Sequence, residues 1–314
     1  MTGHREATTS EDSAGSESRL AGFRQALDQL RIKLTTPYAF LALAVAFAAT
    51  YLVSDLLVGV LEDRFQNALL DAAHQAADTV VRVEREQLAV WRAVAYTEGF
   101  AEAVAAGDAQ AATGLALPLV LNAKLDCLDV VDASGTGLVG LHHVPGGGLT
   151  DYTLEPGQGY ASWPLVARVL AGQADERGDK YADLVQTEWG WVFYTSGPIK
   201  QGERVVGALL VGTYLDGLVT RLSNAALARV SVFTQPGPPT VTTLAPEEPG
   251  ALALDAATYT RTLERQAQEI THREVEVAGR GYGEVAGPFE ARYGSDLGVM
   301  TVALPLSFLS LIHI

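Results

Sequence analysis

Two adjacent histidines, His142 and His143, are the side chains of this sequence best suited to binding a metal ion. No aspartate, glutamate or third histidine stands at a helical or strand spacing that would complete a site with them. Adjacent residues of a strand also point to opposite faces, so we expect this pair in a loop or at an exposed position. The sequence therefore predicts no metal site.

The serines and the glycine-rich segment lack a catalytic context. Ser134 and Ser196 do not stand in a Gly-x-Ser-x-Gly nucleophile elbow. The segment PGGGL at Pro145 lacks the Lys-Ser/Thr pair of a phosphate loop and does not open a helix after a strand. We expect no enzyme activity within this chain and no cofactor.

Aromatic and charged side chains gather between residues 163 and 194, where they could form a ligand pocket. Such a pocket needs an apolar wall and a few inward polar groups. Arg168 or Lys180 could bind a carboxylate or a phosphate. The candidates are Trp163, Arg168, Lys180, Tyr181, Asp183, Trp189, Trp191 and Tyr194. The alternative is that alternate residues of WGWVFY are core and the others are exposed.

Strands and short helices must position these side chains. WGWVFYTSGPI and VVGALLVGTYL, joined by the turn KQGER, are rich in aromatic and β-branched residues and predict a long hairpin. LDCLDVVDASGTGLVGLH predicts a second hairpin, since Asp and Gly at its break supply turn conformations. Helices are expected over residues 109–124, 163–170 and 216–228.

The last third of the chain repeats this pattern in shorter form. SGPIKQGERVVGALLVGTYL and AGPFEARYGSDLGVMTVALPL both read Gly-Pro-apolar, a polar turn, then glycine and an apolar strand. Two tandem copies of one α+β module explain the pattern better than one large domain. We expect the modules over residues 107–228 and 229–308.

The segment from Pro37 to Leu61 has Asp55 as its only charged residue and is long enough to cross a bilayer as a helix. A cleaved signal peptide would lie closer to the N-terminus, and a buried core helix is seldom so long and apolar. The basic residues Arg19, Arg24, Arg31 and Lys33 stand shortly before the segment, and the acidic residues Glu62 and Asp63 follow it directly. The positive-inside rule therefore predicts a cytoplasmic segment 1–36 and an extracytoplasmic remainder.

Composition adds further expectations. Residues 1–18 are polar and should be disordered. In residues 62–106, apolar residues recur at helical spacing, which predicts a long stalk helix. The 314 residues carry a net charge of −15, which should repel nucleic acid. Cys127 is the single cysteine, lies in an apolar strand pattern, and should pack as a small hydrophobe.

The order of anchor, long helix, LDVVDASGTGL, YTSGPI with GERVVGALLVGTYL, and then a second copy resembles the double Cache sensor region of bacterial transmembrane receptors. The resemblance covers about residues 62–308. It implies two PAS-like antiparallel sheets carried on a long N-terminal helix. It also implies a homodimer and a small extracellular ligand, of a class left open, bound in the membrane-distal module, which would be residues 107–228. Residues 229–308 would be the membrane-proximal module.

Two departures from that family qualify these expectations. GYASWPLVARV has Trp163 without the Arg-x-Trp-aromatic motif of the amino-acid-binding branch, and TSGPIKQGER lacks that branch's Asp. Residues 309–314 look like a translated sequencing adaptor, so we expect a receptor truncated before its second span and its output domain. That output would be of histidine kinase, chemoreceptor or cyclase type. The alternative function is a membrane-anchored structural or adhesive surface protein that uses PAS-like modules to hold a partner.

Overall fold

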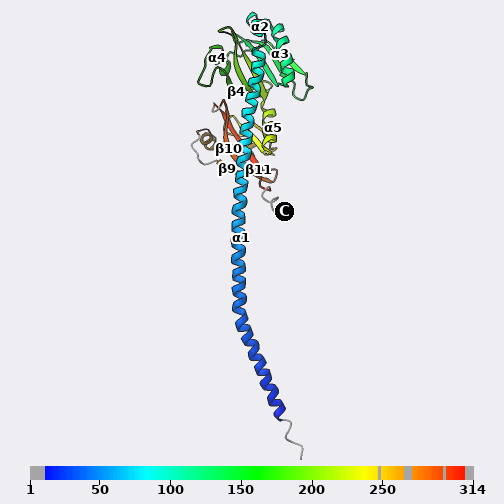
Figure 1. Ribbon diagram of the computed structural model, residues 1–314, viewed down its shortest axis with the longest axis vertical. Coiled ribbons are helices and arrows are strands. Elements are labelled where there is room, and N and C mark those ends of the chain that lie inside the picture. Colours follow the sequence, from blue (N-terminus) through cyan, green and yellow to red (C-terminus); the bar gives the residue numbers. More distant parts are fainter. Residues whose placement is uncertain (1–10, 247–248, 265–270, 293–294, 308–314) are drawn as a thin grey trace, which may run out of the picture. The chain divides into compact units, whose positions relative to one another are not determined.

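A computed structural model describes residues 11–246, 249–264, 271–292 and 295–307 of the chain. It divides into two compact units, Met1–Arg64 and Phe65–Ile314, and each is considered by itself. The fold is mixed α+β, with a long N-terminal helix followed by antiparallel sheets, as expected (Figure 1). Residues 309–314, taken above as an adaptor sequence, lie outside the described residues.

In the first unit, the chain is helical from Glu11, where helix α1 (Glu11–Ala95) begins. The expectation of disorder is therefore wrong for residues 11–18. Extending an existing helix adds one hydrogen bond per residue without a new nucleation cost, which outweighs the polar composition.

The apolar part of this helix has no protein cover in its own unit. Eleven large apolar side chains between Tyr38 and Val60 are at least half exposed. Among the described residues, one helix is long and apolar enough to cross a membrane, with a mean hydropathy of 2.1 in its most apolar window. Exposure of so many large apolar groups is unfavourable in water and favourable in hydrocarbon. The finding supports a candidate membrane helix.

The second unit holds two sheets. The first has six strands in the order β3-β2-β1-β6-β5-β4, and neighbouring strands in it are antiparallel. Together with its helices it forms what we call the N-terminal module. Its elements are α2 (Phe100–Ala106), α3 (Ala109–Ala123), β1 (Cys127–Asp132), β2 (Gly137–His143), β3 (Tyr152–Leu154), α4 (Pro164–Leu170), β4 (Tyr181–Thr187), β5 (Gly190–Gln201), β6 (Arg204–Tyr214) and α5 (Leu215–Ala226).

The second sheet, in the C-terminal module, has five strands in the order β8-β7-β11-β10-β9. The Gly-Pro strands that suggested a repeat are β5 and β10, and their antiparallel partners are β6 and β11. The elements of this module are β7 (Arg229–Phe233), β8 (Val241–Thr242), the 3-10 helix η1 (Pro249–Leu252), α6 (Ala256–Leu263), β9 (Thr271–Val277), β10 (Arg280–Ala291) and β11 (Ser295–Pro305).

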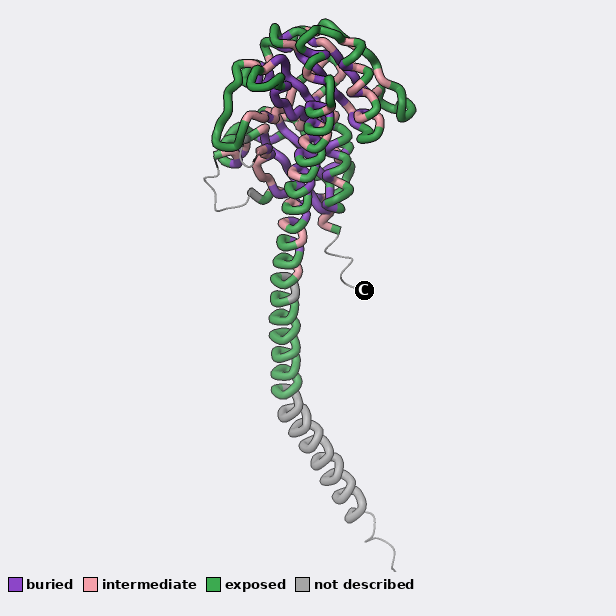
Figure 2. The backbone as a smooth tube through the Cα atoms, turned by 45° about the horizontal axis from the view of Figure 1, so that its top comes forward, coloured by how far each residue is buried: buried purple, intermediate pink, exposed green. Residues whose placement is uncertain are grey.

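Residues 65–95 of α1 contribute to the cores of both modules (Figure 2). The stripe from Phe65 to Val83 packs with α5 and the C-terminal sheet, whereas Trp91 and Val94 pack with α2, α3 and the N-terminal sheet. Gly283 permits the close approach of β10, since an added Cβ would lie 2.5 Å from a ring carbon of Phe65. One rigid helix segment therefore touches both sheets.

The predicted stalk helix over residues 62–106 is wrong at its C-terminal end. Helix α1 ends at Ala95, and Gly99 then adopts φ 83° before α2 begins at Phe100. A positive φ is accessible to glycine at little cost and ends a regular helix. The break lets α2 fold back against β5 and β6.

Candidate functional site

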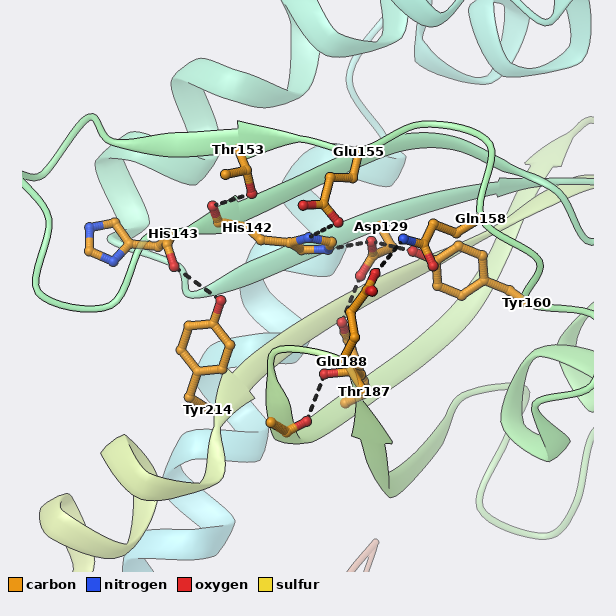
Figure 3. Close-up of polar contacts among 12 residues, drawn as sticks. Asp129, His142, His143, Thr153, Glu155, Gln158, Tyr160, Thr187, Glu188 and Tyr214 are labelled. Carbon is orange, nitrogen blue, oxygen red and sulfur yellow. Dashed lines mark hydrogen bonds and ion pairs between the residues drawn. The ribbon is translucent and has the colours of Figure 1, made fainter.

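The carboxylate of Asp129 lies at the centre of the N-terminal module and is fully buried (Figure 3). Its Oδ1 accepts a hydrogen bond of 2.8 Å from the Tyr160 hydroxyl and lies 2.7 Å from Nε2 of His142. Its Oδ2 accepts a hydrogen bond of 2.8 Å from the Tyr194 hydroxyl. These three partners offset the cost of burying the carboxylate. We call Asp129, His142, Tyr160 and Tyr194 the Asp129 centre.

The sheet register brings these residues to one face. Asp129 on β1 pairs with Gly140 on β2 and with Leu210 on β6, while Tyr194 on β5 pairs with Gly212 on β6. Directly paired residues share a face of a sheet. Gly212 leaves room for the phenol ring, because an added Cβ would lie 2.6 Å from a ring carbon of Tyr194.

Two tryptophans surround the Asp129 centre. The ring of Trp163 lies 4.7 Å from that of Tyr160 and 5.7 Å from that of Tyr194. The ring of Trp189 lies 4.2 Å from the imidazole of His142, at an interplanar angle of 31°. A buried carboxylate within aromatic faces suits a ligand with a cationic group.

Two buried polar atoms at this place have no hydrogen-bond partner among the described residues: Nδ1 of His142 and Nε1 of Trp189. The carboxylate of Glu155 approaches Nδ1 only to 3.8 Å, which is beyond hydrogen-bond distance. Buried polar groups nearly always have a hydrogen-bond partner, so two such atoms without one need an explanation. Groups of a bound ligand would satisfy both atoms.

The turn between β4 and β5 covers the Asp129 centre. Nε2 of Gln158 donates a hydrogen bond of 2.8 Å to Oε1 of Glu188, and Thr187 closes the turn through a bond of 2.6 Å to the Gly190 carbonyl (Figure 3). Glu188 is exposed and Gln158 is half-buried, so water competes for this bond. The bond between Gln158 and Glu188 is therefore a weak contact of this turn.

Burial and the neighbouring charge of Asp129 both raise the pKa of Tyr160 and of Tyr194. Both causes disfavour the phenolate, so the two hydroxyls remain donors at neutral pH.

The structure brings three of the eight predicted residues to this place: Trp163, Trp189 and Tyr194. Asp183, half-buried on β4, pairs with Tyr194, and burial raises the pKa of its carboxyl. Arg168 lies over the Tyr181 ring at 5.6 Å. Lys180 and Tyr181 line a different cavity, described below. Trp191 packs in the cluster with α1 and α5, on the opposite face of the sheet from Tyr194.

The expected position of the histidine pair is wrong for His142, which is buried within β2 at 3% exposure. Its contact with Asp129 is the physical reason, since a charged partner offsets burial of the imidazole. Sequence analysis missed Asp129 and Tyr160 as well. The available signal was an aspartate within the apolar strand LDCLDVVD, where a charge needs a buried partner.

Among the described residues, no group of three or more His, Cys, Asp or Glu side chains could hold a metal ion. Cys127 is buried as expected, and burial raises the pKa of its thiol. A buried thiol with a raised pKa is a poor nucleophile at neutral pH.

Comparison with known proteins agrees with the fold of the second unit. The family model dCache_3, described as a double sensory domain of two-component sensor kinase, matches residues 62–309. No curated protein sequence matches the chain.

Solved structures share the fold at low sequence identity. A domain of a Vibrio parahaemolyticus protein assigned to the sensory box/GGDEF family is 10% identical, with a TM-score of 0.55, over 80% of this chain and 99% of that one. The isoleucine-bound sensory domain of the Campylobacter jejuni chemoreceptor Tlp3 is 9% identical, with a TM-score of 0.51, over 80% of this chain and 96% of that one.

Proposed function

We propose, on the premise that the chain belongs to the dCache_3 family of double sensory domains, that it senses a small molecule at the Asp129 centre. The observation that carries the proposal is a fully buried carboxylate with aromatic neighbours and two unpartnered polar atoms beside it. The comparisons support a sensory domain of the kind found in two-component kinases and chemoreceptors. They do not favour the adhesive alternative.

The chemistry of the centre favours a ligand with a protonated amine. A protonated amine can only donate hydrogen bonds. It would donate to the Asp129 carboxylate and lie against the aromatic rings. An apolar or aromatic body would pack between Trp163 and Trp189. The Campylobacter jejuni relative is bound to isoleucine, which carries an amine, although its fold alone is shared at this identity.

The chain would act at a membrane. The apolar segment from Pro37 to Leu61 would span it with the N-terminus in the cytoplasm, and the sensory modules would face outward. The modules would form the input of a receptor of histidine kinase, chemoreceptor or cyclase type, working as a homodimer. The exposed apolar side chains of residues 38–60 support the span.

The signal would pass from the Asp129 centre to α1 through strand β5. Tyr194 bonds Asp129 on one face, while the neighbouring residues Phe193 and Thr195 bond Gln87 of α1 on the other. A ligand that displaces Tyr194 from Asp129 would also shift the backbone that Gln87 holds. Ligand binding would then move α1 relative to the sheet, in the way of a population shift between two packings.

Thermal melting of the full chain in detergent micelles tests the proposal. The panel contains small primary amines, together with organic acids, sugars and nucleobases. A ligand at a hundred times its dissociation constant stabilises the folded state by about 2.7 kcal/mol, enough for a visible shift. Stabilisation by amines and by no other class is expected. Stabilisation only by acids, or by none of the panel, contradicts it.

A further inference from the structure

A second cavity, of about 270 Å³, lies between α1, the segment that precedes β4, and the turn after β10. Four cationic side chains line it, against two carboxylates: Arg92, Arg177, Lys180, Arg292, Glu84 and Asp179. We infer that this cavity binds a small oxyanion with two or more charged oxygens, such as a phosphate or a dicarboxylate. The site is separate from the Asp129 centre and joins the two modules.

Two of the four cations are fixed in place by aromatic rings. The Arg292 guanidinium lies 4.7 Å from the centroid of the Tyr181 ring, and Nζ of Lys180 lies 4.5 Å from that of Trp91. A cation over an aromatic face is held without losing its charge. Arg292 is also the residue by which the C-terminal module reaches the cavity.

A backbone hydrogen bond and an ion pair also fix Arg292 in place. Arg292 adopts φ 51°, a conformation that costs a non-glycine residue energy. Its N–H donates a hydrogen bond of 3.1 Å to Oε2 of Glu84, and its guanidinium binds Asp175 at 2.7 and 2.9 Å. Three elements of the unit thus meet at one residue, whose side chain is 9% exposed.

The two carboxylates of the cavity already have partners. Burial opposes ionisation of Asp179, but hydrogen bonds from Lys180 and Lys200 outweigh it and lower the pKa of its carboxyl to about 2. Glu84 accepts the backbone N–H of Arg292. The ion pairs with Lys180 and Lys200 account for Asp179, whereas the backbone N–H carries no charge and leaves Glu84 as a second carboxylate in the cavity.

The exposed guanidinium groups of Arg92 and Arg177 make no hydrogen bond or ion pair with any described residue. With Asp175, which pairs with Arg292, three carboxylates stand against the four cations, so a small excess of positive charge remains here in a chain with a net charge of −15. Planar guanidinium groups match the oxygen spacing of carboxylates and phosphates. An oxyanion in the cavity would bridge Arg92 and Arg177 beside Lys180 and Arg292. It would hold the N-terminal module, α1 and the C-terminal module together.

The test is isothermal titration of the full chain in detergent micelles with inorganic phosphate, sulfate and succinate, each against chloride at equal ionic strength. We expect saturable binding of at least one of the three. In an Arg92→Gln, Arg177→Gln double variant the affinity should fall at least tenfold. Arg204→Gln removes an exposed cation elsewhere and should leave the affinity unchanged.

The outcomes separate the alternatives. Preference for phosphate and sulfate identifies a phosphoryl-type ligand, and preference for succinate identifies a dicarboxylate; both support the site. Binding that exceeds chloride for none of the probes, or that falls equally in Arg204→Gln, overturns it. Melting without added anion should be the same for the double variant and the unchanged chain, because both arginines are exposed. An Asp129→Asn variant should retain the anion affinity, which makes this result independent of the proposed function.

Discussion

The side-chain amide of Gln87 donates a hydrogen bond of 3.0 Å to the carbonyl oxygen of Phe193, one residue before Tyr194. The same amide also donates to Thr213 at 3.1 Å and accepts the Thr195 hydroxyl at 2.7 Å. Gln87 is 2% exposed and is one of three buried polar residues in the described part of α1, with Thr79 and Glu84. A helix and the strand that carries Tyr194 are therefore joined by directional bonds as well as by packing.

Replacing Gln87 with leucine should destabilise the second unit. The Phe193 carbonyl and two threonine hydroxyls lose their partner inside the protein, and a buried unsatisfied group costs about 1–3 kcal/mol. Urea unfolding of the full chain in micelles, followed by tryptophan fluorescence, measures the change. Gln110→Leu alters an exposed glutamine of α3 and should change the free energy of unfolding by less than about 0.5 kcal/mol. Equal effects of the two substitutions would show that the Gln87 bonds contribute nothing.

The phenol of Tyr194 should stabilise the Asp129 carboxylate. In Tyr194→Phe, Oδ2 of Asp129 loses its donor while the ring still fills its place, so we expect a loss of about 1–3 kcal/mol of unfolding free energy. Tyr96→Phe is the matched control, since Tyr96 is 77% exposed. Its melting should match that of the unchanged chain, and a Tyr194→Phe variant that melts like the control would refute the assigned bond.

Two glycines should respond to alanine with opposite signs. At Gly207 on β6 an added Cβ would lie 2.4 Å from the Val131 carbonyl oxygen, so backbone must move and overpacking should cost about 1–3 kcal/mol. Gly114 lies inside α3 with open space around it, and alanine there should add about 0.5–1 kcal/mol of stability. Chemical unfolding of both variants measures the signs. A neutral Gly207→Ala would show that β1 and β6 are less closely paired than described.

Asp179 should make stability depend on acid pH. The lysine partners lower the folded-state pKa of its carboxyl to about 2, from an ordinary value near 3.8. Because the folded-state pKa is depressed, the stabilising effect is complete above pH about 4 and disappears as the pH falls toward 2. Lys200→Gln removes one partner, so the folded-state pKa of Asp179 should rise and the stabilising effect should be lost at a higher pH. Thermal melting between pH 2 and 6 measures it, and an unchanged pH profile in Lys200→Gln would contradict the assignment.

The strands of both modules were predictable because their signals are local. WGWVFY and its partner strand alternate within the segment, and the Gly-Pro repeat places β10 opposite β11 in the same way as β5 opposite β6. The end of α1 at Ala95 was not predictable, because the four residues between α1 and α2 do not interrupt the helical spacing of the apolar residues.

The candidate site was predictable only in part. Trp163, Trp189 and Tyr194 stand out by residue type, but Asp129 and His142 belong together through a register that joins β1 to β2. Lys180 and Tyr181 are near the other candidates in sequence, yet they line the second cavity because Arg292, more than a hundred residues later, folds onto Tyr181. Long-range pairing of this kind is set by the tertiary fold and not by spacing along the chain.

The central claim is that Asp129 recognises the ligand, and calorimetric titration with the amine that gives the largest melting shift tests it most directly. Loss of one partner of a buried charge pair costs at least about 2 kcal/mol, so the affinity of Asp129→Asn should fall at least about thirtyfold. Asp216→Asn, at an exposed position of α5, should bind as the unchanged chain does. Equal affinity in all three proteins, with Asp129→Asn still folded by melting, would contradict the account.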